Sequence, residues 1–185
     1  MTGELGYSLP PAIRRIAANF KRVGWASVWI QAVVGVIASI LFIFNALEPN
    51  AGFTSASADL LTTVGLLTIF ISAFWGFRYV LLGRKLGTTN PDLRPKPKAA
   101  IRAIRIGISI SLIGMLITIF GAEIVIADLW TRSLRQVAIG VNTQDTSAFI
   151  NAADIAVVFS VINAIFAHYV GLCASIWLEY VTNRQ

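Results

Sequence analysis

The sequence has 185 residues, of which 56% are hydrophobic and only 13% are charged. Ordinary globular domains carry about 25% charged residues, so this composition is typical of a chain that lies largely in a membrane. A net charge of +6 would suggest nucleic acid in a soluble protein, but here the basic residues are distributed as in a membrane protein. We therefore expect no nucleic-acid partner.

Four long apolar runs account for most of the chain. They cover residues 24–47, 57–82, 103–127 and 155–180. Each exceeds the ~20 residues that an α-helix needs to cross a hydrocarbon core about 30 Å thick. The runs are apolar on all sides, whereas the helices of a soluble bundle carry a polar stripe. We predict an all-α, polytopic membrane protein with a four-helix transmembrane domain over residues 24–182.

The length also limits the chemistry that the chain can carry. Four spans and their short loops leave no room for a separate catalytic domain. The sequence has no glycine-rich phosphate loop, no nucleophile with a base, and no His-Cys-Glu cluster at ligand spacing. The single cysteine, Cys173, lies inside the last span and cannot form an internal disulfide. We predict that the protein is not an enzyme.

Residues 1–23 form a segment of a different kind, the N-terminal cytoplasmic segment. Two prolines suit a helix start near residue 11, and Ile13, Ile16, Ala17 and Phe20 then recur at helical spacing with basic residues beside them. This pattern predicts an amphipathic helix in the membrane interface; a polar lead-in to the first span is the alternative. The segment resembles neither a signal peptide nor a transit peptide, so we expect a mature start and a plasma or thylakoid membrane location.

The basic residues predict the orientation of the protein. All but two of the 15 Lys and Arg residues lie in the N-terminal segment, between the second and third spans, or at the C-terminus. Four spans put these segments on one side, so the positive-inside rule places both termini in the cytoplasm. The outer side holds the two exceptions, Arg132 and Arg135, and is locally acidic through Asp59, Asp128 and Asp154.

The loop between the second and third spans is rich in proline and basic residues. Three prolines within residues 87–98 favour an extended backbone. The basic side chains that follow are Arg94, Lys96, Lys98, Arg102 and Arg105. We expect them to contact anionic lipid head groups, each contributing about 1 kcal/mol near the surface. Docking of an acidic cytoplasmic partner is the alternative.

Small residues form a stripe along one face of the third span. At alternating steps of four and three, they are Gly107, Ser111, Gly114, Thr118 and Gly121. The fourth span carries a similar face that includes Ser160, Gly171 and Ser175. Small side chains let helix backbones approach closely in lipid. We expect these faces to pack against each other or against another subunit.

A few polar residues within the spans are candidates for a function. Glu123 lies near the outer end of the third span, Asn163 and His168 lie within the fourth, and Gln31 lies in the first. Ionisable groups in a membrane span are costly and usually functional. The first three are therefore a candidate path for a cation or proton. The alternative is that the histidine and the amides only form hydrogen bonds between helices, while Glu123 reaches the interface.

Metal and pigment ligation can be weighed from the same residues. Imidazole and carboxylate groups ligate iron and manganese. However, Glu123 and His168 differ by roughly 15 Å in depth at 1.5 Å per residue, so they cannot hold one ion within a protomer. A lone histidine at position 168 does not by itself predict a chlorophyll or haem. Iron or manganese remains the ligand candidate, with no certain cofactor.

Four blocks carry a resemblance to a known family. They are LPPAIRRIAANFKRVGW (9–25), NPDLRPK (90–96), GMLITIFGAE (114–123) and NAIFAHYVG (163–171). In this order they resemble the four-span family called permease in chloroplasts, also named as a small subunit of the inner-envelope protein translocon. The chain is similar to a bacterial, cyanobacterial-type member. The resemblance implies either iron permeation or protein import and carries no ligand set with it.

Two functions follow as hypotheses. The first is transport, with iron or another divalent metal ion passing through an oligomer of the protein, since four short spans do not easily line a pore alone. The second is a non-catalytic assembly factor or subunit of a protein translocon or photosynthetic membrane complex. Its support is the sparse chemistry, the basic loop and the packing faces.

Overall fold

The computed structural model describes residues 9–47, 55–139 and 150–184. Within these ranges the elements are α1 (Pro11–Leu47), α2 (Ala56–Leu86), the short 3-10 helix η1 (Pro91–Leu93), α3 (Pro97–Ile139) and α4 (Ala152–Asn183). The four α-helices are each long and apolar enough to cross a membrane. The predicted fold class, an all-α membrane protein with four spans, is confirmed. The segments between the first and second spans and between the third and fourth, residues 48–54 and 140–149, lie outside the described ranges, as do residues 1–8 and 185.

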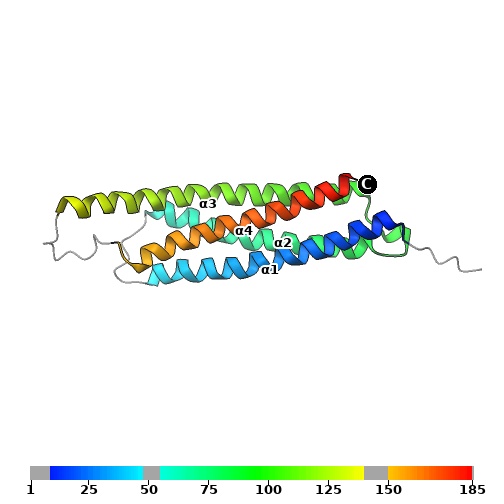
Figure 1. Ribbon diagram of the computed structural model, residues 1–185, viewed down its shortest axis with the longest axis horizontal. Coiled ribbons are helices and arrows are strands. Elements are labelled where there is room, and N and C mark those ends of the chain that lie inside the picture. The colour runs from blue at the N-terminus through cyan, green and yellow to red at the C-terminus, as the bar shows by residue number, and fades with distance from the viewer. Residues whose placement is uncertain (1–8, 48–54, 140–149, 185) are drawn as a thin grey trace, which may run out of the picture.

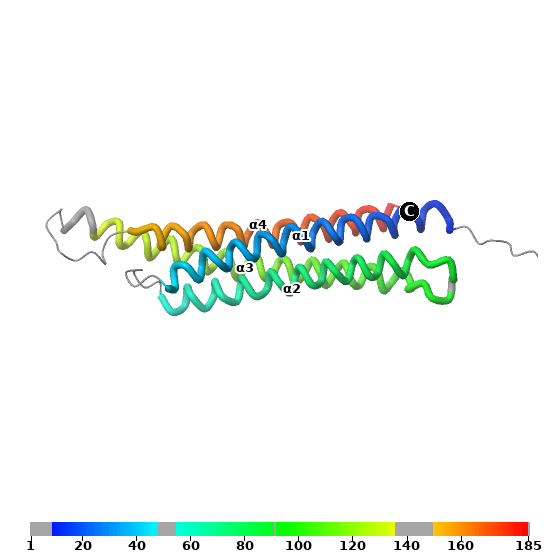
Figure 2. The backbone as a smooth tube through the Cα atoms, turned by 90° about the horizontal axis from the view of Figure 1, so that it is seen from below, coloured from blue at the N-terminus to red at the C-terminus, as the bar shows by residue number. Residues whose placement is uncertain are grey.

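The four helices form one elongated antiparallel bundle (Figure 1). Each helix packs against its neighbours in the chain, α4 closes the ring by packing along α1, and α2 meets α4 across the diagonal. Figure 2 shows the same arrangement from a second side, with α1 next to α4 and α2 next to α3. The start of α1 and the end of α4 therefore lie at the same end of the bundle.

Exposed basic residues gather at this shared end, which we call the basic end. Among the described residues they are Arg14, Arg15, Lys21, Arg22, Arg78, Arg84, Lys85, Lys96, Lys98, Arg102, Arg105 and Arg184. We call the opposite end, where α2 and α4 begin, the far end. This arrangement agrees with the basic segments being grouped on one side. That the basic end faces the cytoplasm remains a prediction.

Local capping sequences fix where the helices begin. The Ser55 hydroxyl accepts a hydrogen bond from the Ala58 amide at 3.4 Å and caps α2. Asn151 and Asp154 form a capping box at the start of α4, with amide-to-side-chain distances of 3.0 and 2.9 Å. Pro97 occupies the first position of α3, where its missing N–H leaves no hydrogen bond unmade.

The amphipathic N-terminal stretch does not form a separate interfacial helix. Residues 11–23 are the first turns of α1, which continues without interruption (Figure 1). Their apolar face packs on the bundle: Ala17 and Phe20 are buried, and Phe20 meets Tyr79 edge to face at 6.1 Å between ring centroids. Gly83 of α2 permits this approach, because a Cβ atom there would lie 2.9 Å from the Ala17 carbonyl oxygen. The bundle covers the face that the sequence assigned to the membrane interface.

The helices are longer than the predicted spans. The longest, α3, has 43 residues. At 1.5 Å per residue this corresponds to about 65 Å, roughly twice the hydrocarbon thickness. Its far end continues past residue 127 to Ile139 and projects beyond its neighbours (Figure 1). The third span therefore continues as a helix beyond its predicted boundary at residue 127.

Large apolar side chains cover the outside of the bundle, while small ones fill its inside. Ile40, Phe74, Phe120 and Phe159, one from each helix, are exposed. Alanine is the most frequent of the buried apolar residues in the described ranges. This distribution is expected in lipid, where large apolar side chains can contact the acyl chains and small residues let helix backbones approach closely.

Candidate functional site

Polar side chains lie along the inside of the bundle and come from all four helices. The buried polar residues that the structure describes are Ser27, Gln31, Asn45, Thr62, Ser72, Ser111, Thr118, Asp154, Ser160, His168 and Ser175. We call this set the polar seam. A buried polar group is costly unless it is hydrogen-bonded, and in a membrane bundle such bonds join helices. The seam is therefore the candidate site, and its hydrogen bonds decide what it can do.

His168 lies fully buried near the middle of α4. Its Nε2 atom is 3.3 Å from the Gly65 carbonyl oxygen and 3.2 Å from the Thr68 hydroxyl oxygen, both on α2. Because a carbonyl oxygen only accepts, a hydrogen bond to Gly65 requires the proton on Nε2. The Thr68 hydroxyl donates to the same carbonyl at 2.7 Å. The imidazole therefore ties α4 to α2.

Two glycines make the space for this histidine and for its neighbour Thr118. The imidazole lies against Gly114 of α3, where a Cβ atom would overlap the ring. The Thr118 hydroxyl donates to the Gly114 carbonyl at 2.8 Å and lies 2.5 Å from the Cβ position of Gly65. These residues do not fit a chlorophyll or haem, because Nε2 faces the backbone of α2 and the ring is enclosed by two helices.

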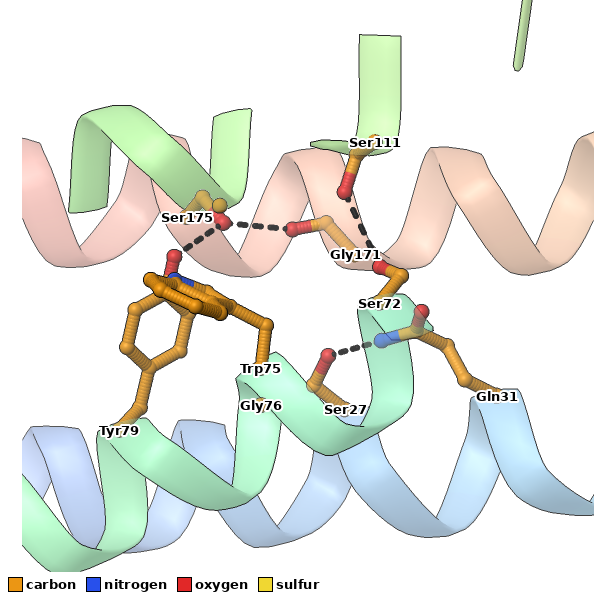
Figure 3. Close-up of a pocket in the computed structure, with 10 residues that line it drawn as sticks. Ser27, Gln31, Ser72, Trp75, Gly76, Tyr79, Ser111, Gly171 and Ser175 are labelled. Carbon is orange, nitrogen blue, oxygen red and sulfur yellow. Dashed lines mark hydrogen bonds between the residues drawn. The ribbon is translucent and has the colours of Figure 1, made fainter. Parts of the chain in front are cut away.

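Closer to the basic end, side chains from three helices converge on Gly171 of α4 (Figure 3). A Cβ atom at Gly171 would lie 2.7 Å from Ser72 Oγ, 2.8 Å from Ser111 Oγ and 3.0 Å from Gln31 Oε1. The two serine hydroxyls are 3.2 Å apart, and Gln31 Nε2 donates to Ser27 Oγ at 2.6 Å. We call Gln31, Ser72, Ser111 and Gly171 the polar hub. The space between them is too narrow for a water molecule.

Tyr79 continues the buried hydrogen bonds toward the basic end. Its hydroxyl lies 2.8 Å from Ser175 Oγ, and the Ser175 hydroxyl donates to the Gly171 carbonyl at 2.9 Å. Since the serine proton is used in this way, the tyrosine hydroxyl is the donor to Ser175. Gly107 of α3 lies against the tyrosine, where a Cβ atom would overlap the hydroxyl. The tyrosine thus links α2 to α4 while packing on α3.

Some polar atoms of the seam are left without a hydrogen bond. Among the described residues these buried atoms are Gln31 Oε1, Asn45 Nδ2, Thr62 Oγ1 and His168 Nδ1. Gln31 Oε1 instead lies 3.0 Å from the position that a Cβ atom of Gly171 would occupy. The seam therefore has unused hydrogen-bonding capacity, but at the polar hub it has no space for a further group.

The far end of the bundle holds an ion pair. Arg132 Nη1 donates to Asp154 Oδ1 at 3.0 Å, and the Asp154 side chain is fully buried. Asp128 Oδ2 accepts a hydrogen bond from the Ser55 amide at 3.0 Å. The extension of α3 is thereby tied to the starts of α2 and α4. Two of the residues expected to make the outer surface acidic therefore do not act as free surface charges. Asp154 is buried, and Asp128 contacts the start of another helix.

The structure does not bring the three residues of the candidate cation path together. Glu123 is exposed on the outside of α3. Asn163 is half-buried, and its side-chain amide donates to the Phe159 carbonyl of its own helix at 2.8 Å. Of the three, only His168 lies in the polar seam. A path through all three would require another bundle or another arrangement of the helices.

The residues predicted for helix packing lie between the helices of this one bundle. They are Gly107, Ser111, Gly114, Thr118, Gly121 and Gly171, and all are buried. The glycines of α3 lie against side chains of α2 and α4, and Gly171 lies against side chains of α1, α2 and α3. These small-residue faces are therefore occupied within the protomer rather than offered to a second copy.

The basic residues after α2 have two kinds of environment. The Arg94 guanidinium donates to the Thr88 carbonyl at 2.9 Å and to the Thr89 carbonyl at 3.1 Å, which holds the turn before η1. The other four predicted contact residues, Lys96, Lys98, Arg102 and Arg105, are exposed. Arg94 thus has a structural role in this turn, and the remaining four are available to a lipid or a partner.

The described part of the chain contains no group of three or more His, Cys, Asp or Glu side chains that could hold a metal ion. Cys173 is exposed on α4, and His168 has only a carbonyl and a hydroxyl beside its Nε2 atom. These residues do not fit a resident iron or manganese ion within one bundle.

Sequence reasoning recognised Gln31 as a buried polar group but not the polar hub around it. Two spacings in the sequence could have indicated further buried polar residues. Ser27 and Gln31 are four residues apart, which places both on one face of α1, and Ser72 and Tyr79 are seven residues apart, two turns of α2. Each pair is polar on an otherwise apolar helix. Which helices these pairs would meet could be seen only in the assembled bundle.

Comparison with known proteins agrees with the resemblance of the four sequence blocks. The chain is 26% identical over 170 residues to Protein TIC 21, chloroplastic, of Arabidopsis thaliana. The matched region is 90% of this chain but 57% of the relative, so the chain spans little more than half of that protein's length. No solved structure matches the chain.

A family model also matches nearly the whole bundle. It covers residues 10–183, from the start of α1 to the end of α4, and its description is "Protein of unknown function (DUF3611)". The suspected family is thereby confirmed. The chain belongs to the DUF3611 family, as a bundle of four membrane-spanning helices similar to TIC 21.

Proposed function

We propose that this protein is a non-catalytic membrane subunit of a transport or translocation assembly, in which its closed bundle serves as a scaffold. The observation that carries the proposal is the filled interior. At the polar hub, three side chains converge on the backbone of Gly171 and leave no room for water. A solute cannot pass through the centre of such a bundle unless the helices separate.

The hydrogen bonds of the seam support a scaffold in the same way. His168 joins α4 to α2, and Tyr79 with Ser175 joins the same two helices nearer the basic end. The hydroxyl of Ser160 donates to the Ala38 carbonyl of α1 at 2.7 Å. Bonds between membrane helices contribute roughly 0.6–2 kcal/mol each. Several of them spread along the bundle favour one fixed arrangement of the helices.

The comparisons support the assembly part of the proposal. The family that the sequence blocks resemble is named both as a permease and as a translocon subunit, and the relative found is TIC 21 of the chloroplast. Because this chain spans only 57% of that relative, any shared activity has to lie in the bundle itself. The bundle offers exposed apolar faces and a basic end to partners.

Purification of the tagged protein from its native membrane in mild detergent tests this proposal. Mass spectrometry of the partners and elemental analysis are made on the same fraction. We expect fixed-ratio recovery with subunits of a larger transport or translocation complex, and no such recovery with an unrelated tagged four-span protein. Recovery as a homo-oligomer without partners, carrying iron or manganese, would contradict the proposal.

A second candidate is permeation of a divalent metal ion between copies of the bundle. The observation that favours it is Glu123, an exposed carboxylate on a membrane-spanning part of α3. A charge on the lipid-facing side of a span is costly, and an oligomer could place several Glu123 side chains around a shared path.

Uptake of Fe²⁺ or Mn²⁺ into cells that express the protein tests this second candidate. Permeation between copies predicts that Glu123→Gln abolishes the added uptake. Glu179→Gln is the control, because Glu179 lies near the basic end of α4. If Glu123→Gln leaves uptake unchanged at equal protein level, the second candidate fails while the scaffold proposal stands.

A further inference from the structure

A groove of about 360 Å³ opens between α2 and α3. Its walls are mainly isoleucines: Ile71 on α2, and Ile106, Ile110 and Ile113 on α3. Its volume falls within the ~300–1,000 Å³ of typical small-molecule pockets. Because both helices span the membrane, an apolar groove on their outer side is filled by lipid or by another protein.

The two hydroxyl groups in the groove are satisfied within the protein. The Ser109 hydroxyl donates to the Arg105 carbonyl at 3.1 Å, and the Thr68 hydroxyl donates to the Gly65 carbonyl at 2.7 Å. Thr68 also lies 3.2 Å from His168 Nε2, so the inner wall of the groove reaches the polar seam. The groove thus suits an apolar chain that needs no hydrogen bonds.

One end of the groove is cationic. Arg105 lines it there, and Arg102, one turn earlier, is also exposed. Trp75 indicates the depth of this end: its indole N–H donates to the Ala103 carbonyl at 2.8 Å, and tryptophan favours the membrane interface. Arg105 therefore lies near head-group depth. Ile113 lies roughly 12 Å deeper, at 1.5 Å per residue along α3.

We propose that this groove binds one acyl chain of an anionic phospholipid whose phosphate lies against Arg105. The isoleucine walls accept the chain, and the guanidinium matches the phosphate in charge and in hydrogen-bonding geometry. A second copy of the protein would cover the walls but would not supply an anion to Arg105 unless it placed an acidic group there. The site is independent of the proposed scaffold function.

Native mass spectrometry of the full-length protein in detergent tests the cationic end. The probes are phosphatidylglycerol and phosphatidylcholine with identical acyl chains. We expect tighter binding of phosphatidylglycerol, and a loss of about fivefold in its affinity in Arg105→Gln, the effect of one cation near a head group. Arg84→Gln, an exposed arginine of α2 at the same end, is the control and keeps its affinity.

A second pair of variants tests the apolar walls. Ile113→Trp fills the groove and should remove the bound lipid. Ile162→Trp is the matched control, since the two isoleucines are 58% and 56% exposed and both lie on membrane-spanning helices. Equal binding of the two lipids, no retained lipid, or lipid retained in Ile113→Trp would overturn the proposal. A wild-type dimer that Ile113→Trp converts to a monomer would assign the groove to a second copy instead.

Discussion

Single glycines set how closely the four helices approach. At Gly24 and Gly83 the helices α1 and α2 come so close that a Cβ atom would lie about 3 Å from backbone atoms of the other helix. At Gly107 and Gly114 the space goes instead to a polar ring, the tyrosine of α2 or the histidine of α4. The glycines therefore have two roles, direct backbone contact and accommodation of the polar seam.

Gly171→Ala will destabilise the protein by about 1–3 kcal/mol, because extra methyl groups in a filled interior cost about this much. The methyl group would lie within 3.0 Å of three oxygen atoms. Gly87→Ala is the control, since a Cβ atom there meets nothing closer than 3.4 Å. Thermal unfolding in one detergent compares them. Equal melting temperatures for the two variants would show that the polar hub is not tightly packed.

Gly114 and His168 should be energetically coupled. Gly114→Ala introduces a methyl group where the imidazole lies, so it destabilises the wild-type protein but not a His168→Ala background. We expect a coupling free energy of about 0.5–3 kcal/mol in a double-mutant cycle, the range for residues in contact. The cycle needs only the four unfolding free energies. Additive effects would mean that the ring does not occupy this space.

The helices depend on one another at the far end, where Arg132 of α3 donates to the buried Asp154 that also caps α4. Arg132→Gln removes a hydrogen bond to a charged group, so we expect a loss of about 1.5–3 kcal/mol. Amide hydrogen exchange in the first turn of α4 should become faster. Arg135→Gln, an exposed neighbour, should change stability by less than about 0.5 kcal/mol. Unchanged exchange in Arg132→Gln would show that the ion pair does not hold the start of α4.

The features of each helix that depend on interactions within its own sequence could be predicted, whereas those that depend on contacts with other helices could not. The spans followed from hydrophobicity over some 20 residues. The packing of residues 11–23 could not be predicted in this way. An amphipathic sequence has the same pattern whether its apolar face contacts lipid or other helices. Gly83 and Tyr79 decide between these, and both come from another helix.

The candidate site was less predictable for the same reason. His168 and Gln31 stood out because each is polar in an apolar run. The Gly65 carbonyl that accepts from the histidine and the Gly171 backbone against which the glutamine lies belong to residues without a polar side chain, and both become visible only when the helices are assembled. A sequence pattern does not identify contacts of this kind with the backbone of another helix.

In its described ranges the whole molecule has an apolar outside, an interior of mainly small apolar residues with a polar seam, and one strongly basic end. The start of α1 and the end of α4 both lie at the basic end (Figure 1). The positive-inside rule predicts that this end faces the cytoplasm. A tag at the C-terminus should therefore resist protease added to intact cells and be cleaved after the cells are opened. Cleavage in intact cells would reverse the orientation.

Ion flux into proteoliposomes tests most directly the central claim that the bundle is closed and acts as a scaffold. Purified wild-type protein and the variants His168→Ala and Gln31→Ala are reconstituted with an Fe²⁺- or Mn²⁺-sensitive dye inside the vesicles. The filled interior around Gly171 predicts that wild-type vesicles take up metal no faster than protein-free vesicles. A wild-type flux that either substitution changes would contradict this account and place a permeation path inside the polar seam.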